Sequence, residues 1–173
     1  MKRWYMLTVV GKDRPGIVAH VTAALYEGGC NLGEASMMRL GDSFTIMLMV
    51  QHQGTAKSLE QILETVIDSM DLHMHIDAIE GRLHQHLLPD VRITVFGADQ
   101  PGIVAKITGA LSNAGLHILN LESDVGGSDA RPFYIMHIEG QAGAGLDALR
   151  SALQVAAGEG VETSLTAIDT LVG

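Results

Sequence analysis

A repeat at an offset of 86 residues constrains this chain of 173 residues more than any other feature. The segment from Gly11 to Gly29 aligns with the segment from Gly97 to Gly115, and eleven of the nineteen positions are identical. Solenoid repeats have periods of roughly 20–50 residues, which are too short to explain this offset. The repeat therefore predicts two copies of one small domain, at residues 1–80 and 90–173, joined by a linker at residues 81–89.

The apolar pattern predicts the same order of elements in each copy: strand, helix, two strands, helix and strand. Apolar residues recur at i, i+1, i+4, i+7 and i+8 in the helix that begins near Ile17 and in the helix that begins near Ile103, which is the spacing of one helical face. The predicted fold class is α+β, with two ferredoxin-like βαββαβ domains in tandem.

The third strand of the first copy is apolar on both faces. Phe44, Ile46 and Leu48 alternate with Thr45, Met47 and Met49, where a sheet with one solvated face would alternate apolar with polar residues. We expect something to cover the second face. Either the copies pack together, or chains form a homo-oligomer, or both.

Charge and hydropathy exclude several classes of function. The formal net charge is −9, and residues 1–89 carry seven basic and ten acidic side chains while residues 90–173 carry four and ten. Direct binding to nucleic acid needs a basic face, so we expect none. No apolar run approaches the ~20 residues of a membrane span, and no signal peptide precedes the first strand, so we expect a cytoplasmic protein without a membrane partner. Cys30 is the single cysteine, which excludes a disulfide framework, and we expect it to be a small buried residue.

The turns that precede the first helix of each copy form the strongest candidate site. Asp13 and Asp99 are suited to cap these helices, and Pro15 and Pro101 suit a first turn. Exposed amides at a helix N-terminus favour a carboxylate or a phosphate, so each turn could hold the carboxylate of a small ligand. The same residues are equally a good helix start with no ligand, and neither turn matches a Walker or dinucleotide motif.

Two βαββαβ copies that each open on a Gly-x-Asp-x-Pro-Gly-Ile-Val-Ala run resemble tandem ACT domains, which are regulatory modules that typically bind amino acids. The resemblance covers nearly the whole chain, and a stand-alone pair is similar to the glycine cleavage system transcriptional repressor family. The same opening also occurs in ACT modules fused to enzymes. In the family, ligands bind where the strand–helix turn of one domain meets the start of the second strand of its partner.

Carried onto this sequence, the resemblance implies two sets of ligand-binding residues. The first set is Gly11, Lys12, Asp13, Arg14, Pro15, Gly16, Ile17, Asn31 and Leu32; the second is Gly97, Asp99, Gln100, Pro101, Gly102, Ile103, His117 and Ile118. The copies differ where charge matters, because Lys12 and Arg14 become Ala98 and Gln100. We therefore expect unequal binding, with the better carboxylate site in the first copy.

Other patterns point to no catalytic residue, no metal and no cofactor. His73 and His75 alternate with apolar residues and are expected on a solvated sheet face, while His84 and His86 fall in the linker. No nucleophile-elbow motif is present, and the predicted strands and helices account for both domains without leaving a third module for catalysis. We therefore do not expect an enzyme.

Two functions remain open. The first is an amino-acid sensor, with glycine as the family's suggestion, that controls a DNA-binding regulator protein. The second is a ligand-free module for protein interaction or dimerisation.

Overall fold

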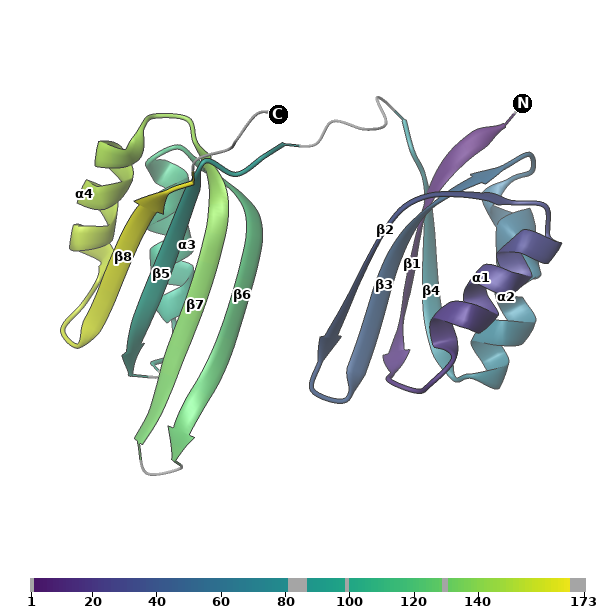
Figure 1. Cartoon of the computed structure of the whole chain (residues 1–173), viewed down its shortest axis with the longest axis horizontal. Helices are drawn as coiled ribbons and strands as arrows, with labels where there is room; N and C mark the ends of the chain where they lie inside the picture. The colour runs from purple at the N-terminus through teal and green to yellow at the C-terminus, as the bar shows by residue number, and fades with distance from the viewer. Residues whose placement is uncertain (1, 81–86, 99, 129–130, 169–173) are drawn as a thin grey trace. The chain divides into compact units, whose positions relative to one another are not determined.

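Each copy of the repeat folds as a βαββαβ unit, which confirms the predicted fold class (Figure 1). The computed structural model describes residues 2–80, 87–98, 100–128 and 131–168, so most of the expected linker at residues 81–89 lies outside the described residues. The chain divides into unit 1 (Met1–Leu83) and unit 2 (His84–Gly173). Unit 1 contains β1 (Arg3–Lys12), α1 (Ile17–Glu27), β2 (Asn31–Leu40), β3 (Ser43–His52), α2 (Ala56–Ser69) and β4 (Leu72–Ala78). Unit 2 contains β5 (Val91–Ala98), α3 (Ile103–Asn113), β6 (Leu116–Ser128), β7 (Arg131–Ala142), α4 (Leu146–Ala156) and β8 (Val161–Ala167).

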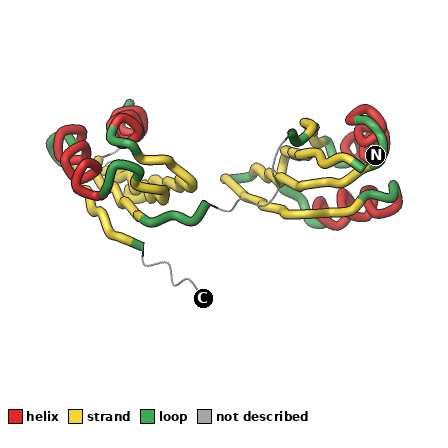
Figure 2. The backbone as a smooth tube through the Cα atoms, turned by 90° about the horizontal axis from the view of Figure 1, so that it is seen from above, coloured by secondary structure: helices red, strands yellow, loops and turns green. Residues whose placement is uncertain are grey.

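Both sheets are four-stranded and antiparallel. Their strand orders are β2-β3-β1-β4 and β6-β7-β5-β8, so the two strands that are central in each sheet are not neighbours in sequence. In each unit the two helices cover one face of the sheet (Figure 2). We call the other face the open face. Within the described part of the chain, no helix is long and apolar enough to cross a membrane.

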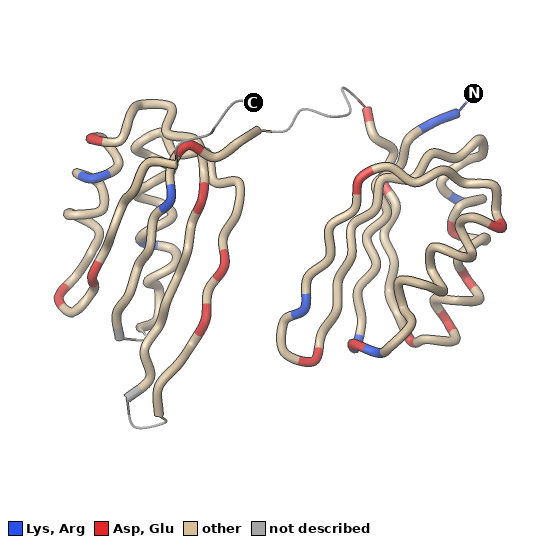
Figure 3. Tube along the Cα trace, in the orientation of Figure 1, with Lys and Arg blue, Asp and Glu red and all other residues tan. Residues whose placement is uncertain are grey.

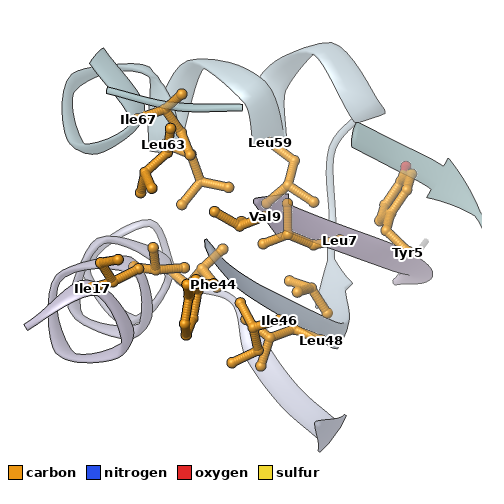
Figure 4. Packing of buried hydrophobic residues seen from close by; sticks show 14 residues of the cluster. Tyr5, Leu7, Val9, Ile17, Phe44, Ile46, Leu48, Leu59, Leu63 and Ile67 are labelled. Atoms are coloured by element: carbon orange, nitrogen blue, oxygen red, sulfur yellow. The ribbon is translucent and has the colours of Figure 1, made fainter. Parts of the chain in front are cut away.

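The core of each unit lies between the sheet and its helices, as Figure 4 shows for unit 1. In unit 1, alternate residues of β1 and β3 point toward the helices, and they meet the apolar stripes that the helical spacing predicts. Each fully buried Leu or Ile stabilises such a core by about 1.5–3 kcal/mol relative to exposure. The buried residues of unit 1 are Tyr5, Leu7, Val9, Ile17, Val21, Leu25, Phe44, Ile46, Leu48, Val50, Leu59, Leu63, Ile67 and Leu72. Those of unit 2 are Val91, Ile93, Val95, Ile103, Ile107, Leu111, Leu116, Tyr134, Met136, Ile138, Leu149 and Leu153.

The open face of unit 1 is apolar, as the alternation in the third strand predicts. In an antiparallel sheet, directly paired residues share a face, and β1 pairs with β3 so that Met6 lies opposite Met49 and Thr8 opposite Met47. Val10 is 42% exposed and Met47 is 46% exposed. Trp4 closes one end of this face by covering Gly33 and Met49.

The open face of unit 2 is more polar than the sequence pattern indicates. Arg92 and Glu139 are paired across β5 and β7 with an Nη2–Oε1 distance of 2.7 Å, and Thr94 Oγ1 lies 3.1 Å from His137 Nδ1. Apolar residues gather only toward one end, where the rings of Phe96 and Phe133 lie 5.4 Å apart. The two units therefore share a fold while their open faces differ in chemistry.

Candidate functional site

The turn between β1 and α1 ends on a glycine with left-handed backbone. Gly16 is the N-cap of α1 with φ 92°, and Gly102 is the N-cap of α3 with φ 86°, a region that costs an L-residue about 1–2 kcal/mol. Neither helix has a side-chain cap. Pro15 and Pro101 lie one position before the N-cap rather than inside the first helical turn. The N-cap residue of each helix therefore has no side chain that could accept from the first helical amides.

The expected capping role of Asp13 is wrong. Arg39 Nε, on β2, donates to Asp13 Oδ2 over 2.7 Å, and the amide of Asp13 donates to the carbonyl of Asp42 over 2.8 Å. The reason is that Gly16 stands at the N-cap, three residues further along, so the Asp13 carboxylate faces the β2–β3 hairpin. Asp99, its counterpart in unit 2, lies outside the described residues.

Gly11 and Gly97 pack closely against neighbouring residues at the base of each turn. A Cβ on Gly11 would lie 2.6 Å from Leu72 Cδ2, and a Cβ on Gly97 would lie 2.9 Å from the carbonyl oxygen of Gly160. Both contacts are with the start of the last strand of the unit. These two glycines hold the turn against the sheet and have no side chain to offer a ligand.

Positive charge gathers at the turn of unit 1. Lys12 and Arg14 are exposed there, and Arg39 is 61% exposed beside Asp13. Basic and acidic groups alternate at this end of the sheet (Figure 3). At the turn of unit 2, Gln100 and Lys106 are exposed polar side chains among the residues that the structure describes. That turn borders a depression lined by Gln100, Pro101, Ile103, Lys106, Ile107, Ala156, Gly158 and Val161.

The remaining candidate residues lie at the opposite end of each sheet from the turn. Asn31 pairs with Gln51, which pairs with Trp4, whereas Lys12 pairs with Ser43. Eight strand residues separate these ends, which is about 26 Å at ~3.3 Å per residue. In unit 2 the same register places His117 opposite Gln141, far from Gly97. In unit 1, the structure thus places Asn31 and Leu32 far from the turn. In unit 2, it places His117 and Ile118 far from the turn in the same way.

A chain of hydrogen bonds beside Asn31 was not predicted from the sequence. Cys30 Sγ lies 3.5 Å from His52 Nδ1, and His52 Nε2 lies 2.8 Å from Ser58 Oγ. Because the Ser58 hydroxyl donates to the carbonyl of Thr55, we assign the Nε2–H tautomer to His52, with Nδ1 accepting from the thiol. Burial raises the pKa of the Cys30 thiol. The positions in unit 2 that correspond to Cys30 and His52 are Leu116 and Ala142, so this series of hydrogen bonds is specific to unit 1.

The histidines of β4 lie on the open face, as expected. His73 and His75 are exposed, and His75 Nε2 lies 3.0 Å from Asp77 Oδ2. His84 and His86 lie outside the described residues. Among the residues that the structure describes, no three His, Cys, Asp or Glu side chains are placed to hold a metal ion.

Comparison with known proteins matches both units to one family. The sequence model of the ACT domain matches residues 5–77 and 90–162. The glycine cleavage system transcriptional repressor of Escherichia coli (strain K12) is 26% identical over 123 residues, which are 70% of this chain and 65% of that protein. A UPF0237 protein of Streptococcus mutans is 44% identical over 85 residues, covering 46% of this chain and 94% of that protein.

A solved structure shares the fold of the whole chain. A crystal structure of a protein from Galdieria sulphuraria superposes with a TM-score of 0.79 at 21% identity, covering 97% of this chain and 99% of that one. At this identity the likeness concerns the fold alone.

Proposed function

Because the chain belongs to the ACT domain family, with two copies of the domain in tandem, we propose that it is a non-catalytic regulatory protein that binds a small amino acid. The observation that carries the proposal is the pair of strand–helix turns. Each ends on a left-handed glycine that leaves the first amides of a helix without a side-chain cap. Such a helix start is suited to the carboxylate of an amino acid.

The turn of unit 1 is the stronger of the two proposed sites. Lys12 and Arg14 are exposed beside the uncapped start of α1, and an Arg can add a charge-assisted hydrogen bond to a carboxylate. Unit 2 has Gln100 in the place of Arg14. We therefore propose that unit 1 binds the ligand more tightly than unit 2.

A ligand that touches both sets of candidate residues requires a second ACT domain. Within one unit the turn and the start of the second strand are at opposite ends of the sheet. Asn31 and Leu32, or His117 and Ile118, can complete a site only for a turn that belongs to another domain. The name of the Escherichia coli relative makes glycine the first ligand to test.

We further propose that the chain acts on genes through a partner protein. The net charge of −9, with neither half basic, disfavours direct contact with the phosphate backbone. The name of the relative, a transcriptional repressor, points to control of transcription, and the partner that we propose is a DNA-binding regulator protein. The change that a ligand causes in this partner's binding can be no larger than the ligand's differential affinity for the two states.

Isothermal titration calorimetry of the full chain against the twenty amino acids tests the proposal. We expect one or more to bind, and Arg14→Ala to weaken binding about tenfold, which corresponds to ~1.4 kcal/mol. Lys57→Ala removes an equally exposed cation from α2 and should leave the affinity unchanged. The absence of heat with every amino acid would refute ligand binding.

A ligand-free interaction module is the second candidate, and the exposed apolar side chains on the open face of unit 1 favour it. The two functions differ in what the turn does. For a sensor, Arg14→Ala changes ligand response and leaves stability intact. For a module, the same variant changes neither, and substitutions on the open face disrupt partner binding instead.

A further inference from the structure

The open face of unit 1 carries a continuous apolar surface at its centre. The open-face positions of β1 and β3 between Trp4 and Val10 hold no charged side chain. Met38 and Leu40 extend the apolar surface onto β2, where they are 55% and 71% exposed. Four of the nine methionines of the chain lie here. This apolar patch consists of Trp4, Met6, Thr8, Val10, Ser36, Met38, Leu40, Thr45, Met47 and Met49. Thr8, Ser36 and Thr45 are polar but uncharged, and Met49 is only 9% exposed.

Charged and ionisable side chains are confined to the margins of the apolar patch. Lys12 lies at one end of β1, Glu34 lies at the bulge of β2, and the edge strand β4 carries His73, His75 and Asp77. Figure 3 shows the middle of β1 and β3 without Lys, Arg, Asp or Glu. An uncharged centre with a polar margin is the usual composition of a protein contact.

Unit 2 shows that the fold itself does not require this composition. Its open face has the same topology and carries the Arg92–Glu139 ion pair, with Glu122 and Asp124 on β6 and Glu162 on β8. That face is charged and suits solvent. The apolar patch is therefore a property of unit 1 and not a by-product of the repeat.

We propose that the apolar patch of unit 1 packs against the same patch of a second copy of this chain. The charged open face of unit 2 is a poor mate for methionines, because burying its acidic groups on them would desolvate unpaired charges. An identical apolar face has no such cost, and a two-fold axis makes the contact self-complementary. Methionine side chains adapt to irregular opposing surfaces, which suits two sheets packed face to face about 10 Å apart.

The size of the patch sets the expected strength of this dimer. Three strands about 4.8 Å apart and seven residues long span roughly 300 Å² of sheet. Stable interfaces bury about 800 Å² per partner, so the patch can form the centre of an interface whose rim comes from β2 and β4. We expect a weak dimer that dissociates on dilution through the micromolar range.

Analytical ultracentrifugation of the full chain over a concentration series tests the proposal. We expect a monomer–dimer equilibrium, and we expect Met47→Lys to raise the dissociation constant at least tenfold. Met47 is already 46% exposed, so the lysine can reach water in the monomer and the unit should remain folded. Val155→Lys, at an apolar residue of α4 that is 89% exposed, and Phe96→Lys, on the open face of unit 2, should leave the equilibrium unchanged.

Two results would overturn the proposal. One is a chain that stays monomeric at every concentration, which would mean that the patch is exposed or covered within the chain. The other is a dimer that Phe96→Lys weakens as much as Met47→Lys does. A second measurement guards against misfolding of the lysine variant: in a Cys30→Ser background, Val10→Cys should be joined into covalent dimers by a short bismaleimide, and failure to cross-link also counts against the contact.

Discussion

At the scale of single residues, the backbone of the strand–helix turn depends on two glycines. Gly16 and Gly102 both adopt a left-handed conformation at an N-cap, and a Cβ on Gly102 would meet no neighbouring atom within 4 Å. The requirement at Gly102 is therefore conformational and not a matter of space.

This distinction predicts opposite effects for two glycines of the same segment. Gly102→Ala should destabilise unit 2 by about 1–2 kcal/mol, because an L-residue is strained at positive φ. Gly109→Ala should stabilise it by about 0.5–1 kcal/mol, because Gly109 lies inside α3 with open space around its Cβ position. Urea denaturation of both variants measures the two changes, and a shift of the same sign would contradict the explanation.

The Cys30–His52–Ser58 chain makes a second prediction at this scale. Ser58→Ala leaves His52 Nε2 without its acceptor and should destabilise unit 1 by about 1–2 kcal/mol. Ser69→Ala removes an exposed serine of the same helix, which bonds only to the Val66 carbonyl. We expect it to change stability by less than about 0.5 kcal/mol. Equal effects in urea denaturation would mean that the bond to His52 contributes nothing.

At the scale of elements, the start of α2 has the side-chain cap that α1 lacks. Thr55 is the N-cap of α2, and its Oγ1 accepts from the amide of Ser58 over 3.2 Å. Asp13, in contrast, is tied to Arg39 of a neighbouring strand. Within unit 1, the start of α2 is thus stabilised by a local side-chain cap, whereas the start of α1 depends on packing against the rest of the unit.

The two helix starts should respond differently to substitution of the polar residue before each helix. Thr55→Ala should cost about 1 kcal/mol, the usual effect of losing a cap. Asp13→Asn should cost about 0.5 kcal/mol or less, because its ion pair with the exposed Arg39 is screened by solvent. Chemical denaturation of unit 1 variants separates the cases, and a larger loss for Asp13→Asn would show that the carboxylate supports α1 directly.

The order of the elements was predictable from sequence, while some of their contacts were not. The repeat and the 3.6-residue spacing determine which segments are helices, and both are visible in single residues such as Ile17 and its mate Ile103. The role of Asp13 was predicted wrongly, since an N-cap aspartate and an aspartate three residues before a glycine N-cap look alike in sequence. The Cys30–His52 contact joins residues 22 apart and depends on the register of β2 against β3, which no local pattern reveals.

At the scale of the whole molecule, each unit has a core of its own. The buried clusters of unit 1 and unit 2 contain no residue in common and consist of helix residues packed on their own sheet. The candidate site is less predictable than these cores. Its turns follow from the motif, but the site that we propose is completed by residues of another domain, and a repeat does not reveal how domains pair.

Separate cores predict that a defect in one unit stays there. Leu63→Ala, at a fully buried residue of α2, should destabilise unit 1 by about 2–5 kcal/mol. Hydrogen exchange followed by mass spectrometry should show faster exchange in β1, β3 and α2, with β5, β7 and α3 unchanged. Accelerated exchange in both units would show instead that they unfold together.

The left-handed glycine at each helix start also bears on how a duplicated domain can diverge. The fold of each turn depends on the left-handed backbone of Gly16 or Gly102. The charge of the turn depends instead on neighbouring residues such as Arg14 or Gln100. Mutation can therefore alter the charge of one turn without endangering its fold. After duplication, the two turns could thus diverge in charge while both domains kept the same architecture.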